Sequence, residues 1–316
     1  LCNLQEARNL EAKRTKSKSK TKKNLSIIGI ILGVIILAGG GYAYYLYHSV
    51  SETANKMYSP LKGKNSKDLP LNKENTAPSI NVLLLGVDER SGDKGRSDTM
   101  IVASLNPTTH SMLMTSIPRD TRVEIPGRSG YSKINAAYAY GNEELALETV
   151  EKYLNIDIPY YVKVNMEGLS SLVDAVGGVS VNNDISWTGF PKGTLNLDGK
   201  KALAYARMRH EDPRGDFGRN LRQRQVITGV MEKGKSLSSV SNMENILNAV
   251  GGNVTTNLSF DDMKRLVSDY KSCRENITDY ETKGTPKYLD GVSWVLVTDQ
   301  EFQNVHNKIE TQLNAK

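Results

Sequence analysis

The chain has 316 residues, with 41 lysines and arginines and 35 aspartates and glutamates, which gives a formal net charge of +6. This excess lies in residues 1–24, where eight basic and two acidic residues stand, so residues 25–316 carry 33 of each sign. A neutral globular part argues against a nucleic-acid-binding protein, which needs a basic face. Cys2 and Cys273 stand at opposite ends of the chain, so no disulfide framework is expected.

Residues 25–47 contain no charged side chain, and this run of 23 residues exceeds the roughly 20 that cross the hydrocarbon core of a bilayer. Basic residues precede it and four tyrosines cluster at its far end. The positive-inside rule therefore predicts a basic cytoplasmic tail at 1–24, a transmembrane signal-anchor helix at 25–47 and an extracellular remainder, a single-pass type II topology in the cell membrane. The alternative is a signal peptide cleaved near Ala43, which also exports the rest of the chain.

Residues 48–79 are polar and contain three prolines, which predicts an extracellular stalk before one domain at 80–316. In that domain, apolar runs typical of strands alternate with helical stripes. The expected strands are 80–87, 99–105, 111–117, 160–164 and 292–298, and the expected helices are 143–154, 166–176, 199–206, 219–232, 261–271 and 299–314. The alternation predicts an α/β fold with a mixed central sheet and helices on both of its faces.

Two aspartates are expected at neighbouring strand ends, Asp88 just after the first strand and Asp98 just before the second. Ligands of open α/β sheets sit at strand ends, and two carboxylates there could hold a hard cation such as Mg²⁺. Ordinary turn chemistry is the alternative, because aspartate is common at strand ends and helix starts. Arg119 and Asp120 follow the third strand, and a surface ion pair of little energetic value explains them equally well.

Residues 207–224 contain six arginines. Arg207 and Arg209, if extended, point the same way, while Arg219 and Gln223 are one helical turn apart on a stripe that continues through Val226. Arg219 and Gln223 are expected to line an inward cleft. Arg207, Arg209 and Arg219 are expected to bind phosphate oxygens, for which the guanidinium is well suited. The alternative is a solvated basic helix face. We expect Arg222 and Arg224 to lie on such a face.

Motifs of other chemistries are absent from the sequence. It contains no Walker A loop, no GxGxxG, no CxxC pair, no GxSxG elbow and no zinc-ligand spacing among its four histidines.

Seven segments together resemble the LytR-CpsA-Psr family, and more narrowly its teichoic acid transferases. They are NVLLLGVD (81–88), RSDTM (96–100), SIPRDT (116–121), KIN (133–135), DAVGGV (174–179), LDGKKALAYARMR (197–209) and DFGRNLRQRQ (216–225). The resemblance covers roughly residues 80–230 in order and spacing, and residues 232–316 add no motif.

The resemblance implies a phosphotransferase that moves an anionic glycopolymer from a polyprenyl-pyrophosphate carrier to peptidoglycan, forming a phosphodiester at the C6 hydroxyl of muramic acid. It also implies a hydrophobic tunnel for the prenyl chain, whose lining the sequence does not assign. The positions that match metal-associated carboxylates, with Mg²⁺ or Mn²⁺, are Asp88 and Asp98. The positions that match pyrophosphate contacts are Arg96, Arg119, Lys133, Arg207, Arg209, Arg219 and Gln223.

Asp98, Arg119 and Arg219 are the expected catalytic residues. The arginines would stabilise charge on the leaving phosphate, and Asp98, or else Asp216, would accept the proton of the acceptor hydroxyl. The expected partners are the lipid-linked glycopolymer, peptidoglycan and membrane lipid, without nucleic acid. Two other functions fit less well: an anchored protein that binds polyprenyl-phosphate lipid or anionic polymer without turnover, and a transcription regulator.

Overall fold

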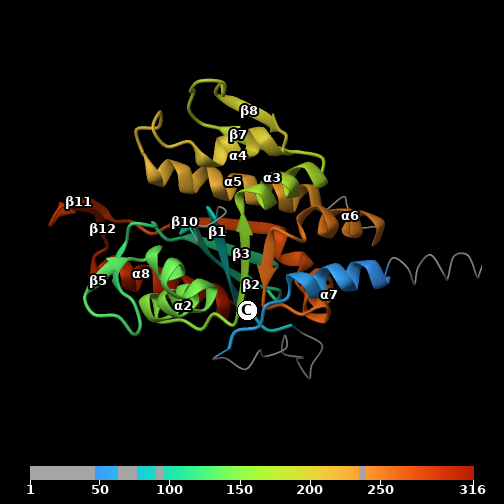
Figure 1. Cartoon of the computed structure of the whole chain (residues 1–316), viewed down its shortest axis with the longest axis horizontal. Coiled ribbons are helices and arrows are strands. Elements are labelled where there is room, and N and C mark those ends of the chain that lie inside the picture. The colour runs from blue at the N-terminus through green and yellow to red at the C-terminus, as the bar shows by residue number, and fades with distance from the viewer. Residues whose placement is uncertain (1–46, 63–76, 90–94, 235–239) are drawn as a thin grey trace, which may run out of the picture. The chain divides into compact units, whose positions relative to one another are not determined.

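The structure is a computed structural model that describes residues 47–62, 77–89, 95–234 and 240–316 (Figure 1). The chain divides into two units, Leu1–Ser49 and Val50–Lys316, and the second contains every element described below. The predicted tail and the predicted anchor, except for Tyr47, lie outside the described residues. Over the ranges that are described, no helix combines the length and apolar character that a membrane crossing requires.

A mixed six-stranded sheet forms the centre of the second unit, as predicted. In spatial order its strands are β10 (Asn276–Glu281), β3 (Ser111–Ser116), β2 (Ser97–Asn106), β1 (Ile80–Val87), β6 (Tyr160–Asn165) and β9 (Val254–Thr256). β1 pairs with β2 in antiparallel and with β6 in parallel orientation, and β10 runs parallel to β3. The three central strands are nearly continuous apolar runs because helices cover both faces of the sheet.

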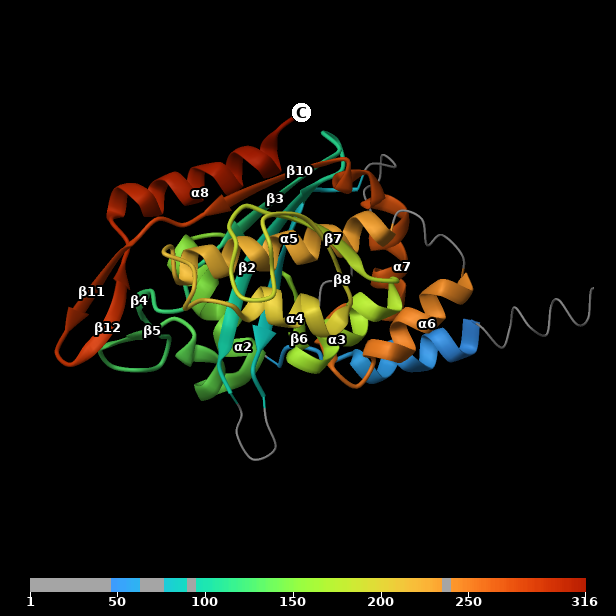
Figure 2. The same ribbon diagram turned by 90° about the horizontal axis from the view of Figure 1, so that it is seen from above.

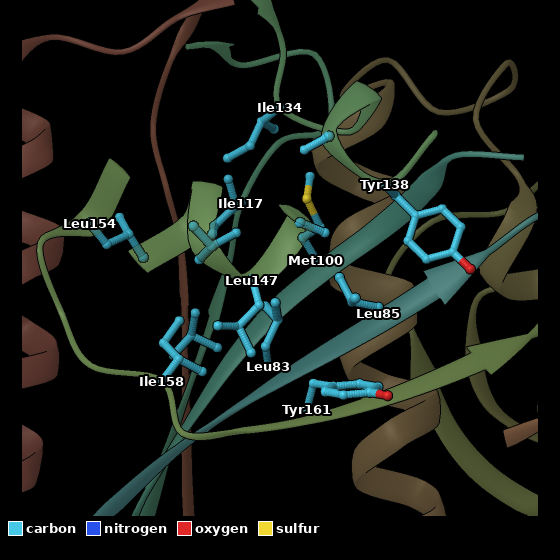
Figure 3. Packing of buried hydrophobic residues seen from close by; sticks show 14 of the residues in the cluster. Leu83, Leu85, Met100, Ile117, Ile134, Tyr138, Leu147, Leu154, Ile158 and Tyr161 are labelled. Atoms are coloured by element: carbon cyan, nitrogen blue, oxygen red, sulfur yellow. The ribbon is translucent and has the colours of Figure 1, made fainter. Parts of the chain in front are cut away.

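Two helices, α2 (Ala136–Leu154) and α8 (Asp299–Asn314), cover one face of the sheet (Figures 1 and 2). Figure 3 shows this core from close by: Leu83 and Leu85 of β1 pack beside Met100 of β2 and Leu147 of α2. Each of these four side chains is at most 2% exposed. Burial of an aliphatic side chain of this size contributes about 1.5–3 kcal/mol, so this layer is a major source of the unit's stability.

The opposite face is covered by α5 (Asp216–Gly234) and α7 (Phe260–Asp269), with the single-turn η1 (Lys271–Arg274) beside them. A further layer packs over α5, and Figure 1 shows it above the sheet. It consists of α3 (Met166–Ala175), α4 (Gly199–Arg207) and the hairpin of β7 (Val179–Asn183) and β8 (Gly193–Leu197). The remaining elements are α6 (Val240–Val250) and two hairpins, β4 (Arg122–Glu124) with β5 (Tyr131–Lys133) and β11 (Thr285–Leu289) with β12 (Val292–Leu296).

One end of the strands, called the sheet edge below, collects the carboxyl ends of β1, β3, β6 and β10 and the starts of β2 and β9. The register places Val87 of β1 opposite both Ser97 of β2 and Asn165 of β6. Ser116, which ends β3, stands beside Glu281, which ends β10. The segments that follow β1 and β3 and precede β2 therefore meet at this edge, and they contain the first three motif segments of the sequence.

The structure differs from the prediction of a stalk over residues 48–79. Residues 50–57 are helical, and Val50, Ala54 and Met57 are at most 5% exposed. After this helix the chain is fixed to the sheet, because Ser59 donates its backbone N–H to the carbonyl of Thr256 in β9 at 2.7 Å. The apolar spacing of 50, 54 and 57 is a helical stripe that the surrounding polar residues obscure. The domain thus takes in residues well before 80, and residues 63–76 of the predicted stalk lie outside the described part.

Candidate functional site

Arg119 is the central cation of the sheet edge. It follows β3 through Ile117 and Pro118, and its Nη1 lies 2.9 Å from Oδ1 of Asp98, while its Nε donates to Oδ2 of Asp216 at 3.2 Å. Burial would lower the pKa of Arg119, but the carboxylates of Asp98 and Asp216 outweigh it and raise the pKa above its ordinary value. Arg119 therefore links the sheet, through Asp98, to the first residue of α5.

Three further arginines lie nearby, two of them beside Asp216 and the third beside Asp88. Arg219, 7% exposed, has its Nη2 3.5 Å from Oδ2 of Asp216, and Nη1 of Arg209 lies 3.5 Å from Oδ1 of that carboxylate. Arg207 is 3.9 Å from Asp88. Burial lowers the pKa of Arg219, and neighbouring Arg119 lowers it further against the pull of Asp216. A guanidinium remains protonated despite this shift. Arg219 is therefore a buried, charged hydrogen-bond donor at the sheet edge.

Arg207 and Arg209 lie together in a different way from the extended pair that the sequence predicted. Arg207 is the last residue of α4, and the chain leaves the helix at Met208, whose backbone is extended. Both side chains nevertheless line one polar pocket, because the turn between α4 and α5 folds the chain back over the sheet edge.

Two adjoining polar pockets bring all of the predicted site residues together. They share Asp88, Asp98, Arg119 and Arg209. The first pocket adds Arg96 and Lys133, and the second adds Arg207, Arg219 and Gln223. Sequence reasoning did not assign four polar lining residues to the site, which are Asp120, Asn135, His210 and Ser293. With Asp216, six basic side chains meet four carboxylates here, so the site carries about two net positive charges and favours an anionic ligand.

An apolar cavity of about 270 Å³ opens beside the second polar pocket. The two have Met166, Arg207 and Gln223 in common. The apolar lining comes from β1, β6, α3, α4 and α5 and consists mainly of Leu84, Val162, Val164, Leu169, Leu172, Leu203, Ile227, Val230 and Met231. Gly86 lies in this wall beside Thr99, and a Cβ there would come within 2.8 Å of the Thr99 side chain. The site therefore consists of a charged pocket that adjoins an apolar cavity.

The prediction that Arg222 and Arg224 face solvent is wrong. Arg222 is 1% exposed and donates through Nη1 to Oδ2 of Asp212 at 2.5 Å, and also to the carbonyls of Tyr205 and Met208. Arg224 is 5% exposed, with Nε donating to Asp279 at 2.7 Å and Nη1 donating to a carboxylate of β10. Both arginines are structural: the first holds the turn that carries Arg209, and the second fastens α5 to the edge strand β10.

The pKa values of two acidic partners of these arginines shift in opposite directions. Burial alone would raise the pKa of Asp212, but the hydrogen bonds that Arg214 and Arg222 donate lower it to about 2. Burial raises the pKa of Glu281 to about 6, even though Arg224 and Asn220 donate to its carboxylate. These carboxylates therefore belong to the scaffold that positions α5 and its arginines.

Two motif segments away from the pocket are also structural. Asp174 accepts the backbone N–H of Gly199 through Oδ1 at 2.7 Å, which joins the end of α3 to the start of α4. A Cβ at Gly199 would lie 2.1 Å from the carbonyl oxygen of Ser170, so only glycine permits this approach. Segments 174–179 and 197–199 hence set the packing of the helices that wall the apolar cavity.

The donor set at the sheet edge fits a divalent cation that is shared with a bound phosphate. Asp88 and Asp98 line both polar pockets, and two carboxylates are enough for Mg²⁺ when substrate oxygens and water complete its coordination. In the described residues no cluster of three or more potential metal ligands occurs, so the protein alone supplies an incomplete shell. Oδ1 of Asp216 is buried without a hydrogen-bond partner, and the guanidinium of Arg209 lies 3.5 Å from it.

Comparison with known proteins identifies the family. The profile of the LytR-CpsA-Psr family matches residues 44–311. The polyisoprenyl-teichoic acid–peptidoglycan teichoic acid transferase TagU of Bacillus mycoides (strain KBAB4) is 47% identical over 293 residues, which cover 91% of this chain and 96% of that protein. The TagU of Bacillus subtilis (strain 168) is 41% identical over 306 residues, covering 95% of this chain and 99% of that protein.

A solved structure shares the fold as well. TagT bound to LIIa-WTA superposes with a TM-score of 0.69 at 30% identity, over 82% of this chain and 100% of that one. The family profile spans most of the chain, and the two transferases cover it almost completely. The chain therefore belongs to the LytR-CpsA-Psr family.

Proposed function

We propose that the protein is a phosphotransferase that moves an anionic, wall teichoic acid-type glycopolymer from a polyprenyl-pyrophosphate carrier to peptidoglycan. The observation that carries this proposal is that the apolar cavity adjoins the second polar pocket, with Met166, Arg207 and Gln223 lining both. A ligand that fills both must have an anionic head joined directly to a long apolar chain, and a prenyl pyrophosphate has this form. The 47% identical relative from Bacillus mycoides carries the name of the same activity.

The reaction requires the site to hold the pyrophosphate and to neutralise the charge that develops on it. The acceptor, which we propose to be the C6 hydroxyl of muramic acid, attacks the phosphorus next to the sugar of the donor. A phosphodiester forms, the bond to the other phosphate breaks, and polyprenyl phosphate leaves with the electron pair. Arg207 stands where the apolar cavity adjoins the second polar pocket, and Arg219 lines that pocket, so both are placed to stabilise the leaving phosphate.

Arg119 and Arg209 line both polar pockets, so they reach the phosphorus that is attacked. Arg96, Lys133 and Gln223 complete the set of groups proposed to bind the pyrophosphate. Asp88 and Asp98 are proposed to hold Mg²⁺, or Mn²⁺, which when bound supplies further charge neutralisation on the phosphate oxygens.

The proton of the acceptor hydroxyl is proposed to pass to Asp98, with Asp216 as the second candidate. Asp98 lies in both polar pockets and its carboxylate is held in place by Arg119 at 2.9 Å. Asp216 is also paired with Arg119, but its Oδ1 accepts no hydrogen bond.

The test is a direct assay of the full-length protein in detergent. It is incubated with a synthetic polyprenyl-pyrophosphate-linked disaccharide, uncrosslinked peptidoglycan strands and Mg²⁺. Mass spectrometry should detect the glycan conjugate and polyprenyl phosphate in equal amounts, and Arg119→Ala should abolish both. A protein that binds donor without releasing polyprenyl phosphate would instead be the non-catalytic binding protein, for which the net positive site is also suited.

We also propose that residues 25–47 anchor the chain with its catalytic domain outside the cell. A substrate whose prenyl tail lies in the bilayer is reached most directly by an enzyme attached to that bilayer. Alkaline phosphatase fused after residue 80 should be active and remain with the membrane fraction. Activity released into the medium would indicate cleavage near Ala43, and an inactive fusion would contradict the orientation.

A further inference from the structure

A largely buried lysine outside the polar pockets joins two glutamates and a tyrosine. Nζ of Lys163 in β6 lies 3.2 Å from Oε1 of Glu89 and 3.0 Å from Oε1 of Glu143. It also donates to the hydroxyl of Tyr138 at 3.1 Å, and that hydroxyl donates to the carboxylate of Glu89. None of these four residues lines either polar pocket. They are called the lysine cluster below.

The lysine cluster holds one cation between two carboxylates. The side chains of Lys163 and Glu143 are 13% and 16% exposed, and Tyr138 is 2% exposed. Burial would lower the pKa of Lys163, but Glu143 and Glu89 outweigh it and raise the pKa, so the ammonium is charged at neutral pH. Burial raises the pKa of Tyr138, and its hydrogen bond to Glu89 raises it further, so the phenol remains a donor. The cluster therefore carries one net negative charge, and the ammonium is what keeps the two glutamates together.

Two members of the lysine cluster are direct chain neighbours of residues that line the polar pockets. Glu89 follows Asp88, which lines both pockets, and Tyr138 precedes Ala139, which lines the first. Lys163 belongs to β6 and is paired with Leu85 of the adjacent strand β1. The cluster thus ties the end of β1 and the start of α2 to a central strand of the sheet.

The helix α2 is interrupted where it meets the lysine cluster. Gly141 and Asn142 leave the helical conformation, and Asn142 has a φ of 55° and a ψ of −149°. Residues other than glycine seldom adopt this region, and they remain in it only where the surrounding contacts hold them. Glu143, the next residue, is bound by Lys163. The ion pair therefore fixes the second part of α2 directly after the break, and Tyr138 fixes the first part.

Asp88 is held on both sides along the chain. On one side, its backbone N–H donates to the carbonyl of Arg96 at 3.4 Å. Gly95 makes this close return of the chain possible, because a Cβ there would lie 2.3 Å from the carbonyl oxygen of Asp88. On the other side, the side chain of Glu89 is held by Lys163 and Tyr138. The placement of the Asp88 carboxylate therefore depends on the lysine cluster.

We propose that Lys163 is a positioning residue for Asp88, which it sets in place for cation binding by holding Glu89 away from the polar pockets. Without the ammonium, Glu89 and Glu143 would repel each other, since both lie within 3.2 Å of the same nitrogen. Glu89 would then be drawn to the polar pockets, which carry about two net positive charges, and it would displace Asp88 with it. The inference rests on the role proposed for Asp88 in holding Mg²⁺ or Mn²⁺.

The test is a titration of the full-length protein in detergent with Mn²⁺, in which electron paramagnetic resonance measures the free ion. Farnesyl pyrophosphate is present to supply phosphate oxygens, and it carries no glycan to transfer. Lys163→Met should raise Kd for Mn²⁺ roughly tenfold, because loss of a group that orients a metal ligand typically weakens metal binding about ten- to a hundredfold. Lys163→Arg, which keeps the charge, should recover most of the affinity. The double variant Lys163→Met with Glu89→Gln should also recover much of it, because the displaced charge is then absent.

Glu143→Gln is the matched variant, because it removes a charge from the same cluster but leaves Lys163 paired with Glu89. It should lower Tm while Kd for Mn²⁺ stays within twofold of the wild type. Binding of farnesyl pyrophosphate in EDTA should stay within twofold in every variant. If Lys163→Met does not fold, Tyr138→Phe removes only the hydroxyl that donates to Glu89 and should raise Kd for Mn²⁺ about threefold.

An unchanged Kd for Mn²⁺ in folded Lys163→Met, or in Tyr138→Phe where the first does not fold, overturns the inference. An equal rise in Lys163→Met and Glu143→Gln also overturns it, because the cluster would then act only through the stability of the fold. A wild type that binds no Mn²⁺ overturns it together with the metal role of Asp88. A raised Kd that Lys163→Arg restores supports it even if no glycan is transferred, so its failure and that of the proposed reaction are distinguishable.

Discussion

Replacement of Arg222 by methionine tests how the turn between α4 and α5, which carries Arg209, is held in place. All three nitrogens of this guanidinium donate to residues 205–212: Nε to the carbonyl of Tyr205, Nη1 to the carboxylate of Asp212 and Nη2 to the carbonyl of Met208. The guanidinium also lies 5.1 Å from the ring of Trp187. Methionine retains most of the apolar stem but leaves the buried carboxylate with fewer donors.

The expected loss in the free energy of unfolding depends on which hydrogen-bond donors Asp212 retains. Breaking a buried ion pair costs about 3–5 kcal/mol, because the remaining charge is left without compensation. Arg214 still donates to Asp212 at 3.0 Å, so we expect the lower figure, about 3 kcal/mol. For a domain of this size, each kcal/mol lowers Tm by roughly 2–4 °C, so the variant should unfold about 6–12 °C earlier.

Circular dichroism of the full-length protein in detergent measures this change. The control is Lys200→Met on the exposed side of α4, which should leave Tm within about 1 °C. The double variant Arg222→Met with Asp212→Asn should recover part of the loss, because it removes the buried charge along with its partner. A Tm for Arg222→Met within about 2 °C of the wild type would refute the assignment of this arginine to the scaffold.

Three further outcomes are expected in the site and its scaffold. Arg219→Ala should lower kcat/KM by roughly ten- to a hundredfold, with Arg219→Lys recovering only part of it and Lys200→Ala close to wild type; equal losses in all three would indicate a diffuse charge effect. Asp88→Ala or Asp98→Ala should remove the dependence of transfer on Mg²⁺ together with most of the activity, whereas full activity in EDTA would give these carboxylates another role. The pKa of Asp212 is lowered to about 2 in the folded state. The ionised carboxylate therefore stabilises the fold fully above about pH 4, and this stabilisation is lost as the pH falls towards 2. Urea unfolding between pH 5 and pH 2 should show a smaller loss for Asp212→Asn than for the wild type.

The strands that carry the site were predictable because their apolar runs are long and their ends are marked by charged residues. β1, β2 and β3 agree with the sequence within two residues at each end. The strands β9 and β10 were not predicted. β9 has three residues and β10 reads Asn-Ile-Thr-Asp-Tyr-Glu, half exposed and polar, so its strand character comes from pairing with β3 rather than from its own pattern.

The burial of Arg222 and Arg224 could not be predicted for a related reason. α5 is packed between the sheet and the outer layer, so both of its sides are buried and no single apolar stripe distinguishes inside from outside. The carboxylates that compensate Arg224 lie 55 and 57 residues further along the chain. Arg219 was placed correctly because its stripe continues into Val226, which is fully buried. The apolar cavity has walls from six elements, so its lining only becomes visible once these are assembled.

The two outermost strands of the sheet have a consequence for any shortened form of the protein. β9 and β10 both come from the segment after residue 234, and they pair with β6 and β3. A chain that stopped at residue 234 would keep every motif residue and still leave two unprotected sheet borders, one of them along Met112 and Met114 of β3. Open borders of this kind recruit other chains, so such a fragment would be prone to aggregate during synthesis rather than to act as a smaller enzyme.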